Sequence, residues 1–208
     1  MKKCLIVGGA PIADYERVKS LLKDEYFTIY CDCGLRHREK LGIEPDLVVG
    51  DFDSHPRPEG TGETIVLPCV KDDTDSVYAV KEALRRGFRE FVLIGAVGAR
   101  FDHTMANISL LLMLDKNGAR GLIIDDHSRM ELAGQETKYV DEGCIFFSLL
   151  SIAGPARGIE IKNAKYPLHD GEITPEYQYG VSNEVLPGKR AEISVAEGEL
   201  LLVIIDRK

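Results

Sequence analysis

The stretch Leu47-Val48-Val49-Gly50-Asp51-Phe52-Asp53-Ser54 decides how the rest of this chain is interpreted. Its three leading apolar residues predict a buried strand, and Gly50 allows the backbone to turn sharply after it. Two aspartates then follow, one residue apart. In extended backbone, side chains at positions i and i+2 lie on the same face. We therefore expect both carboxylates to point the same way from the carboxyl end of the strand.

Two carboxylates held this close repel each other unless a cation or a proton lies between them. Hard oxygen ligands that leave room for substrate phosphates suit Mg²⁺. An Asp-x-Asp pair by itself also fits a solvated acidic turn. The assignment of a magnesium site therefore depends on the rest of the chain.

The composition of the 208-residue chain is that of an ordinary globular protein, with 44% apolar and 29% charged residues. This length allows one large domain or two small ones. The net charge of -8 disfavours non-specific binding to nucleic acid or to an anionic membrane, because both need a basic patch. No apolar run approaches the roughly 18 residues of a membrane-spanning helix, and the N-terminal apolar run is too short for a signal peptide.

The five cysteines form no CxxC pair, and four of them lie in or beside apolar runs: Cys4, Cys31, Cys69 and Cys144. We therefore expect buried free thiols. Free thiols, no signal peptide and no membrane span together fit a protein of the reducing cytoplasm.

Over the first 125 residues, apolar runs alternate with stretches of helical periodicity. Strands are expected at 4–8, 27–31, 46–49, 65–67, 90–95 and 122–125. Helices are expected at 12–23 and 35–41, through 77–84 with Gly87 closing the helix, and in a segment that ends near 116. This alternation predicts an α/β domain with a mostly parallel sheet and helices on its faces.

After Asp126 the pattern changes to short β-like runs separated by Gly, Pro and Asn, without a clear helix. Strands are expected at 144–148, 158–162, 191–195 and 200–205, with Glu197-Gly198-Glu199 as a hairpin loop. These features predict a small antiparallel β-sandwich. The predicted fold class is α/β plus all-β, with a first domain at 1–127 and a second at 128–208.

Polar residues gather where the expected strands of the first domain end. They are Asp32 after the second strand, Asp51 and Asp53 after the third, Asp72 and Asp75 before one helix, and Arg100, Asp102 and His103 before the next. Ligands of open α/β sheets bind beyond the carboxyl ends of the strands. Crowded like charges cost energy, so this convergence favours a divalent-metal site that handles phosphates.

The segment Lys71-Asp72-Asp73-Thr74-Asp75 has two interpretations. Thr74 is typical of a helix N-cap, and aspartates stabilise the positive end of a helix. Thr74 and the amides of the first helical turn are also suited to hold a phosphate. The first interpretation does not explain why Lys71 and three carboxylates face a loop that is already acidic.

The pattern Gly95-x-x-Gly98-x-Arg100-x-Asp102-His103 is followed by Asn107. Two glycines allow backbone amides to approach an anion, and Arg100 supplies a planar fork that suits phosphate. Asp102 is a candidate helix cap, and His103 and Asn107 share one helix face. The same pattern fits a tight strand-to-helix turn in which His103 is structural. The chain has no Walker A motif, no G-x-G-x-x-G after the first strand and no G-x-S-x-G, so any use of ATP proceeds without a P-loop.

Taken in order, these segments resemble the motifs of the thiamine pyrophosphokinase family. The matching segments are Asp32-Cys33-Gly34, Pro45-Asp46, Gly50 to Ser54, Asp72 to Asp75, Gly95 to Asn107, Tyr166-Pro167-Leu168 and Ser182-Asn183. The resemblance covers nearly the whole chain. Cys33 stands where the family has the first glycine of Asp-Gly-Gly, and Ala99 where a third glycine is common, so both positions need a negative φ.

The resemblance implies a Mg²⁺-dependent kinase that transfers pyrophosphate from ATP to the hydroxyl group of thiamine, giving thiamine diphosphate and AMP. It also implies a homodimer whose thiamine site is shared between subunits. The implied magnesium ligands are Asp51, Asp53 and Asp75. The implied ATP contacts are Asp32, Thr74, Arg100, Asp102 and His103, and the implied thiamine contacts are Lys71, Tyr166, Ser182 and Asn183. Catalysis would rest on Asp51, Asp53, Asp75, Arg100 and Asp72, with Asp72 and Asp102 as candidate general bases.

The chain has no Trp, so stacking on thiamine falls to Tyr166, which has a smaller ring face and also fits a half-buried strand tyrosine. Three other functions remain open: a pyrophosphokinase for another acceptor alcohol such as a hydroxymethylpterin, a metal-dependent phosphohydrolase, and a nucleotide-binding sensor with a β interaction module. The reaction products distinguish them.

Overall fold

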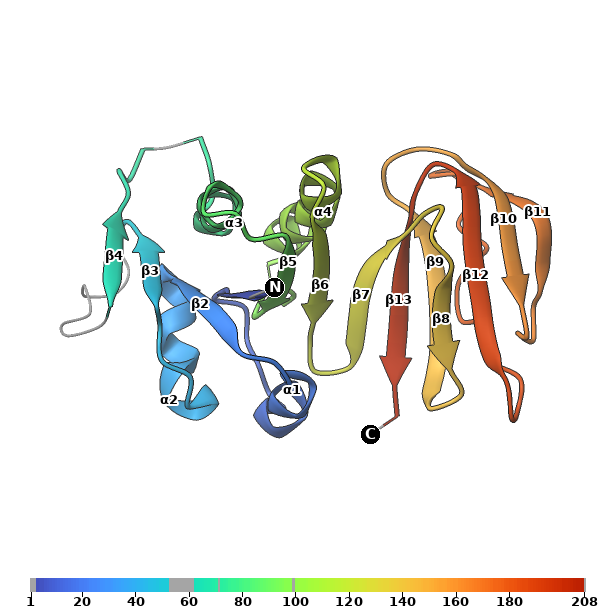
Figure 1. The fold of residues 1–208 in the computed structure, drawn as a ribbon, viewed down its shortest axis with the longest axis horizontal. Coiled ribbons are helices and arrows are strands. Elements are labelled where there is room, and N and C mark those ends of the chain that lie inside the picture. The colour runs from blue at the N-terminus through green and yellow to red at the C-terminus, as the bar shows by residue number, and fades with distance from the viewer. Residues whose placement is uncertain (1–2, 53–61, 71, 99, 208) are drawn as a thin grey trace. The chain divides into compact units, whose positions relative to one another are not determined.

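The computed structural model describes residues 3–52, 62–70, 72–98 and 100–207. Contacts divide the chain into two compact units, Met1–Asp126 and His127–Lys208 (Figure 1). Each unit has its own hydrophobic core. Among the described residues, no helix has both the length and the apolar character that crossing a bilayer requires.

The first unit contains a parallel sheet with the strand order β4-β3-β2-β1-β5-β6. Its strands are β1 (Lys3–Val7), β2 (Tyr26–Cys31), β3 (Leu47–Gly50), β4 (Glu63–Val66), β5 (Glu90–Ile94) and β6 (Arg120–Ile124). The chain runs outward from β1 to β4 and then returns to the other side of β1 with β5. The predicted α/β class is confirmed, and this order creates a switch point between β1 and β5.

Helices cover both faces of this sheet. The connections run from β1 toward β4 on one side and toward β6 on the other, and right-handed connections in opposite directions place their helices on opposite faces. They are α1 (Tyr15–Leu21), the 3₁₀ helix η1 (Asp32–His37), α2 (Arg38–Leu41), α3 (Asp75–Arg85) and α4 (Phe101–Lys116). Figure 1 shows α1 and α2 on one face and α3 and α4 on the other. Leu5 and Val7 of β1 pack with Val18 of α1 in the core on the first of these faces.

Two helix boundaries differ from the prediction for local reasons. Helix α1 begins at Tyr15 rather than at residue 12, because the Asp14 carboxylate caps it by accepting from Arg17 N. The Asp126 carboxylate accepts from Ala13 N and Asp14 N, which holds the preceding residues outside the helix. The segment expected to turn before a helix at 35 already forms η1 from Asp32 onward.

The second unit is a β-sandwich of antiparallel strands, as predicted. One sheet has the order β7-β13-β9 and the other β11-β10-β12-β8. The strands are β7 (Ser128–Ala133), β8 (Lys138–Asp141), β9 (Cys144–Ser151), β10 (Ala156–Lys162), β11 (Leu168–Ile173), β12 (Arg190–Glu197) and β13 (Leu200–Asp206). Alternate residues of both sheets form the core, as Phe147 and Leu149 of β9 and Ile193 and Val195 of β12 illustrate.

The prediction of a hairpin at Glu197-Gly198-Glu199 is wrong. Strand β12 pairs with β10 and β8, whereas β13 pairs with β7 and β9. The turn therefore carries the chain from one sheet to the other. Gly198 has a φ of 80°, and a Cβ there would lie 2.6 Å from the Pro155 carbonyl oxygen. A glycine-containing turn has the same local chemistry whether or not its flanking strands pair with each other.

The prediction of buried free thiols is confirmed at three of its four positions and is wrong at the fourth. All five cysteines are free thiols, and Cys4, Cys31 and Cys144 are buried. Cys69 is exposed, because it lies beyond the end of β4 rather than within a strand.

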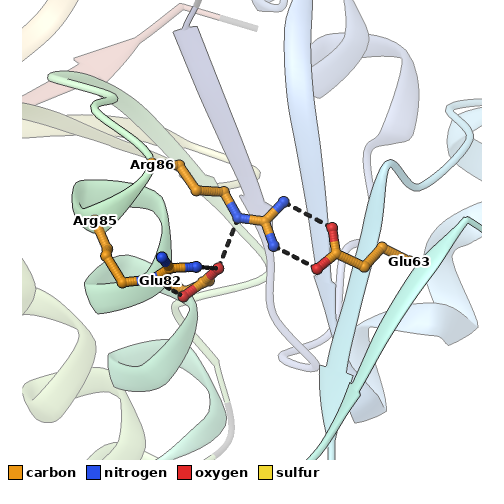
Figure 2. A network of polar contacts seen from close by, with 4 residues as sticks. All are labelled: Glu63, Glu82, Arg85 and Arg86. Carbon is orange, nitrogen blue, oxygen red and sulfur yellow. Dashed lines mark hydrogen bonds and ion pairs between the residues drawn. The ribbon is translucent and has the colours of Figure 1, made fainter.

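A network of two glutamates and two arginines joins β4 to α3 (Figure 2). The Arg86 guanidinium donates to both oxygens of Glu63 at 2.6 and 2.8 Å and, through Nε, to Glu82 Oε1 at 2.7 Å. Arg85 also donates to both oxygens of Glu82. Glu82 is 7% exposed, and its hydrogen bonds to Arg85, and then the one to Arg86, lower its pKa to about 2. The network stabilises a short edge strand whose described pairing is with β3 alone.

We expect Arg86→Met to lower the free energy of unfolding by roughly 2–4 kcal/mol, because it leaves the buried Glu82 carboxylate with one exposed partner and releases Glu63. Arg85→Met, which removes an exposed guanidinium, should cost no more than about 1 kcal/mol. Urea unfolding at pH 7 measures both. The pKa of Glu82 is lowered from 4.5, so this stabilisation is complete above about pH 4.5 and is lost as the pH falls toward 2. Equal losses in the two variants would contradict the bridging role of Arg86.

Candidate active site

A pocket of about 400 Å³ opens in the first unit where the strand order reverses between β1 and β5. Its lining comes from the loops after β1, β2 and β5 and from the first turns of α3 and α4. These residues are Gly9, Ala10 and Pro11; Cys31, Cys33 and Arg36; Gly95, Ala96 and Gly98; Thr74, Asp75 and Ser76; and Arg100, His103, Thr104 and Asn107.

The floor of the pocket depends on close contact between the loops after β1 and β5. A Cβ on Gly8 would lie 2.4 Å from the Gly95 carbonyl oxygen, and one on Gly95 would lie 2.3 Å from that of Gly8. Gly95 also has a φ of 59°, which favours glycine. Ala10 N donates to Gly95 O at 2.8 Å. Side chains at these two positions would push the two loops apart.

The N-terminus of α3 borders the pocket with the cap that the sequence predicted. Thr74 Oγ1 accepts a hydrogen bond from Val77 N at 3.3 Å, and Asp75 and Ser76 of the first turn line the pocket. Asp73 forms an ion pair with Lys81 of the same helix, with 2.7 Å between Nζ and Oδ2. The Asp73 carboxylate, which precedes α3, is therefore paired with a cation of that helix.

The N-terminus of α4 is capped differently from the prediction. Asp102 does not cap the helix: Arg100 is the N-cap residue, and its guanidinium pairs with both oxygens of Asp102, at 3.2 Å from Nε and 2.5 Å from Nη2. Thr104 reaches back instead, and its Oγ1 accepts from Gly98 N at 3.1 Å. Both side chains of this ion pair project into solvent at the start of the helix, at 70% and 65% exposure. The pairing lowers the pKa of Asp102 to about 2.

His103 and Asn107 both line the pocket, as their shared helix face predicted. They differ in burial. Asn107 is buried and its Nδ2 donates to Ala96 O at 2.8 Å, which holds the turn after β5 in place. His103 is exposed. Asn107 therefore supports the pocket wall, while His103 is accessible to a ligand.

The loops after β2 and β3 meet beside the pocket. Asp32 begins η1 and is 2% exposed, and a Cβ on Gly50 would lie 2.5 Å from the Asp32 Cβ. Asp51 is half-buried. Phe52 has a φ of 57°, so the backbone is not extended between Asp51 and the next aspartate. The predicted pairing of the two carboxylates on one face involves Asp53, which lies outside the described residues.

The predicted magnesium ligands are only partly described by the structure. Asp75 lines the pocket and Asp51 lies at the end of β3, whereas Asp53 falls outside the described residues, as does Lys71. Within the part of the chain that is described, no group of three or more His, Cys, Asp or Glu is arranged to hold a metal ion. The donors that are present are carboxylate oxygens, which suit Mg²⁺.

Of the other predicted residues, the structure brings Thr74, Arg100 and His103 to the pocket. Asp32, Asp72 and Asp102 are outside its lining, although Asp32 lies between the lining residues Cys31 and Cys33. Cys33 has no positive φ, in agreement with its prediction, and Ala99 lies outside the described residues.

A buried histidine that the sequence analysis did not single out supports the loop after β1. His37 of η1 is 2% exposed. Its Nδ1 lies 2.7 Å from Tyr15 Oη and its Nε2 lies 3.0 Å from Ala10 O. A carbonyl only accepts, so Nε2 carries the proton and Nδ1 accepts from the tyrosine hydroxyl. Burial lowers the pKa of His37, so the ring is neutral and holds a pocket wall in place.

Two family models match the chain in order. The model for "Thiamin pyrophosphokinase, catalytic domain" matches residues 18–123, which include α3, α4 and the loops after β2 and β5. The model for "Thiamin pyrophosphokinase, vitamin B1 binding domain" matches residues 137–200 of the second unit. The chain belongs to the thiamin pyrophosphokinase family. The resemblance recognised from its motifs is confirmed, and the chain is an enzyme of this family.

Individual relatives of this family agree with the models. The thiamine pyrophosphokinase of Bacillus subtilis (strain 168) is 28% identical over 211 residues, which cover 98% of each chain. A crystal structure of thiamine pyrophosphokinase from Bacillus subtilis matches with a TM-score of 0.86 and 24% identity over 100% of both chains. One from Geobacillus thermodenitrificans matches with a TM-score of 0.82 and 24% identity, over 99% of this chain and 98% of that one. These two structures show the fold.

In the second unit, Asn183 clamps the backbone of Tyr166. Asn183 Oδ1 accepts from Tyr166 N at 3.0 Å, and its Nδ2 donates to Tyr166 O at 2.7 Å. Asn183 is 5% exposed, whereas Tyr166 is 59% exposed and lies outside the strands. The alternative of a half-buried strand tyrosine is therefore wrong. Lys165 Nζ lies 5.6 Å from the centre of the Tyr166 ring.

Ser182 lies beside this clamp in a left-handed conformation, with a φ of 59°. Its backbone N donates to Ser148 Oγ at 3.0 Å, and the residue is exposed. Ser182 and the Tyr166 ring are thus the accessible members of the predicted thiamine contacts that the structure describes, while Asn183 holds the segment in place.

We expect the free energy of unfolding of His37→Gln to depend less on pH than that of the wild type. Because burial lowers the pKa of His37 from 6.5, its stabilising effect is complete above about pH 6.5 and is lost as the pH falls through the lowered value. The wild type should therefore lose more free energy of unfolding between pH 7.5 and pH 5.5 than the variant does, as measured by urea unfolding. His169→Gln, which changes an exposed histidine, should retain the wild-type loss. Identical pH dependence in His37→Gln and the wild type would contradict a neutral buried ring.

Proposed function

We propose that this protein transfers the pyrophosphoryl group of ATP to the hydroxyl group of thiamine, giving thiamine diphosphate and AMP, with Mg²⁺ as cofactor. The observation that carries the proposal is the order of the two family models, a catalytic domain over 18–123 and a vitamin B1 binding domain over 137–200. The pocket between β1 and β5 is lined largely by residues of the first of these segments.

The chemistry of the pocket supports its use for a nucleotide. Its volume of about 400 Å³ is in the range of small-molecule sites. The first turns of α3 and α4 border it, and the N-termini of helices attract phosphate through their amide groups and the helix dipole. Gly95 and Gly98 let the loop after β5 pack closely against Gly8, Ala10 and Pro11 of the loop after β1, which maintains the shape of the pocket. We therefore assign ATP to this pocket, with Thr74, Arg100 and His103 among its contacts and Asp32 at its edge.

Magnesium would be held by Asp51, Asp53 and Asp75. When bound, it neutralises the charge that develops on the transferred phosphates. The described members of this set, Asp51 and Asp75, offer the carboxylate oxygens that Mg²⁺ prefers. Asp75 is also next to the cap residue Thr74, so its backbone is held by the start of α3.

The reaction requires the thiamine hydroxyl oxygen to attack the β-phosphorus while the bond from that phosphorus to the AMP oxygen breaks in line. Positioning and charge neutralisation carry most of such a transfer, and a weak base is enough for a loose transition state. Arg100 lowers the pKa of Asp102 to about 2, which makes this carboxylate a poor proton acceptor. Of the two candidate bases we therefore favour Asp72, which is exposed at the start of the segment that leads into α3.

We assign the thiamine contacts to Tyr166 and Ser182 of the second unit, with Asn183 as the residue that positions Tyr166, and to Lys71 of the first. The thiazolium ring of thiamine is cationic and aromatic, so an exposed tyrosine face suits it. We also propose that the active protein is a homodimer with thiamine bound at the subunit interface, and that it works in the cytoplasm, where its five free thiols stay reduced.

The direct test follows the fate of the phosphates. With thiamine, Mg²⁺ and ATP labelled at the β-phosphate, the label should appear in thiamine diphosphate, with one AMP formed for each thiamine diphosphate. Product formation should stop when EDTA removes the metal and resume when Mg²⁺ is added in excess. Chromatography separates the products. Label in another alcohol but not in thiamine would reject the acceptor, and ADP or free phosphate would reject pyrophosphoryl transfer.

Tyr166→Ala should raise the KM for thiamine by roughly tenfold, because it removes a stacking and cation–π face. The KM for ATP should change by less than about twofold, and Tyr166→Phe should restore most of the thiamine affinity. Tyr177→Ala is a matched control, since Tyr177 is another exposed tyrosine of the second unit. Steady-state kinetics with each substrate varied in turn measure these values. Equal effects on both KM values would mean that Tyr166 contributes only to packing and does not contact thiamine.

A further inference from the structure

The pocket faces an electrostatic problem if it binds a polyanion. The chain has a net charge of -8, and Asp75 lines the pocket beside the buried Asp32. Both carboxylates contribute to the raised pKa of the Cys33 thiol, after desolvation by burial, which is the larger cause. The Mg²⁺ assigned to Asp75 would offset part of this charge, and cations in the lining would offset the rest as phosphates enter.

Two guanidinium groups are found among the described lining residues, those of Arg36 and Arg100. Arg100 already donates to both oxygens of Asp102. The Asp102 carboxylate occupies the guanidinium N–H groups that would otherwise bind a phosphate. The net charge of the Arg100–Asp102 pair is therefore close to zero. To bind an anion with its full charge, Arg100 would first have to exchange Asp102 for it.

Arg36 is in a different state. Its Nε donates to the Cys33 carbonyl oxygen at 2.9 Å, which directs one edge of the guanidinium to the backbone and leaves its Nη1 and Nη2 groups as further donors. Within the described residues, Arg36 makes no ion pair with a carboxylate. It therefore brings an uncompensated positive charge to the pocket lining.

The backbone that carries Arg36 is rigidly held. Gly34, two residues earlier in η1, packs so closely that a Cβ there would lie 2.1 Å from the Val7 carbonyl oxygen. His37, the next residue, is buried and bonded to Ala10 O and to the Tyr15 hydroxyl. Ala10 itself lines the pocket. These contacts fix the start of the Arg36 side chain relative to the pocket wall, which lowers the entropy cost of using it as a ligand.

We propose that Arg36 binds the phosphate chain of the nucleotide and is the cation that first receives it, while Arg100 is paired with Asp102. The inference rests on the proposed function, because it takes ATP as the ligand of this pocket. A guanidinium fork matches the geometry of phosphate oxygens better than an ammonium group does, and its charge offsets the neighbouring carboxylates. The adenine base would gain little from that charge.

The test measures nucleotide binding without thiamine, by isothermal titration calorimetry with ATP, ADP, AMP and adenosine. Arg36→Gln should weaken ATP binding at least tenfold and adenosine binding by less than twofold, with ADP and AMP between them. Arg36→Lys should lie between Arg36→Gln and the wild type. Arg38→Gln is the matched control, because Arg38 is two residues away and pairs with Glu44 outside the pocket lining; it should bind ATP as the wild type does.

An equal loss for ATP and adenosine in Arg36→Gln would overturn the proposal, because it would indicate a contact with the nucleoside or a collapsed pocket. Unchanged ATP binding in Arg36→Gln would overturn it as well. If the wild type binds ATP and forms thiamine diphosphate while Arg36→Gln binds ATP normally, the inference about Arg36 fails and the proposed function stands. If the wild type binds ATP with the expected dependence on Arg36 but does not pyrophosphorylate thiamine, only the proposed reaction fails.

Discussion

The close backbone contact between Gly8 and Gly95 is the constraint on which the rest of the site depends. These residues directly follow the neighbouring strands β1 and β5 at the point where the strand order reverses, and each would place a Cβ within 2.4 Å of the other's carbonyl oxygen. The loops after β1 and β5 then leave in different directions and open a pocket at the sheet edge. Without this contact, the helix N-termini of α3 and α4 would not border one shared space.

Around this contact, buried polar side chains hold the pocket walls from behind. His37 bonds the Ala10 carbonyl, Asn107 bonds that of Ala96, and Thr104 accepts from the Gly98 amide. Each satisfies a backbone group of an irregular loop that has no strand or helix partner at that position. Such supports fix loop geometry without entering the chemistry themselves, which leaves the accessible side chains to meet a ligand. In the second unit, Asn183 likewise holds the backbone of Tyr166 through two hydrogen bonds.

Charge in the first unit is arranged in local pairs rather than as one acidic patch. Asp73 is paired with Lys81, Asp102 with Arg100, and the buried Glu82 with Arg85 and Arg86. The acidic loops therefore carry less net charge toward the pocket than the sequence suggests. This pairing changes which cation is available to a ligand, since it engages Arg100 and leaves Arg36 without a carboxylate partner among the described residues. The short edge strand β4 relies on the same kind of pairing for its attachment to α3 (Figure 2).

The sequence by itself determined the two-part fold, the main strands and helices, the cap at Thr74 and the family, because periodicity, turn residues and motif order are local properties. It did not determine β7, β8 and β11, whose apolar pattern is short or interrupted, with polar residues such as His169 and Asp170 of β11 exposed to solvent. Only the tertiary structure decided that Glu197 to Glu199 crosses between sheets, that Asp102 engages Arg100 instead of capping α4, and that Arg36 lines the pocket while His37 supports its wall. Each of these depends on which segments distant in the chain, or which competing partners, meet in space. The local sequence limits which partners a side chain can have, and tertiary packing determines which of them it contacts.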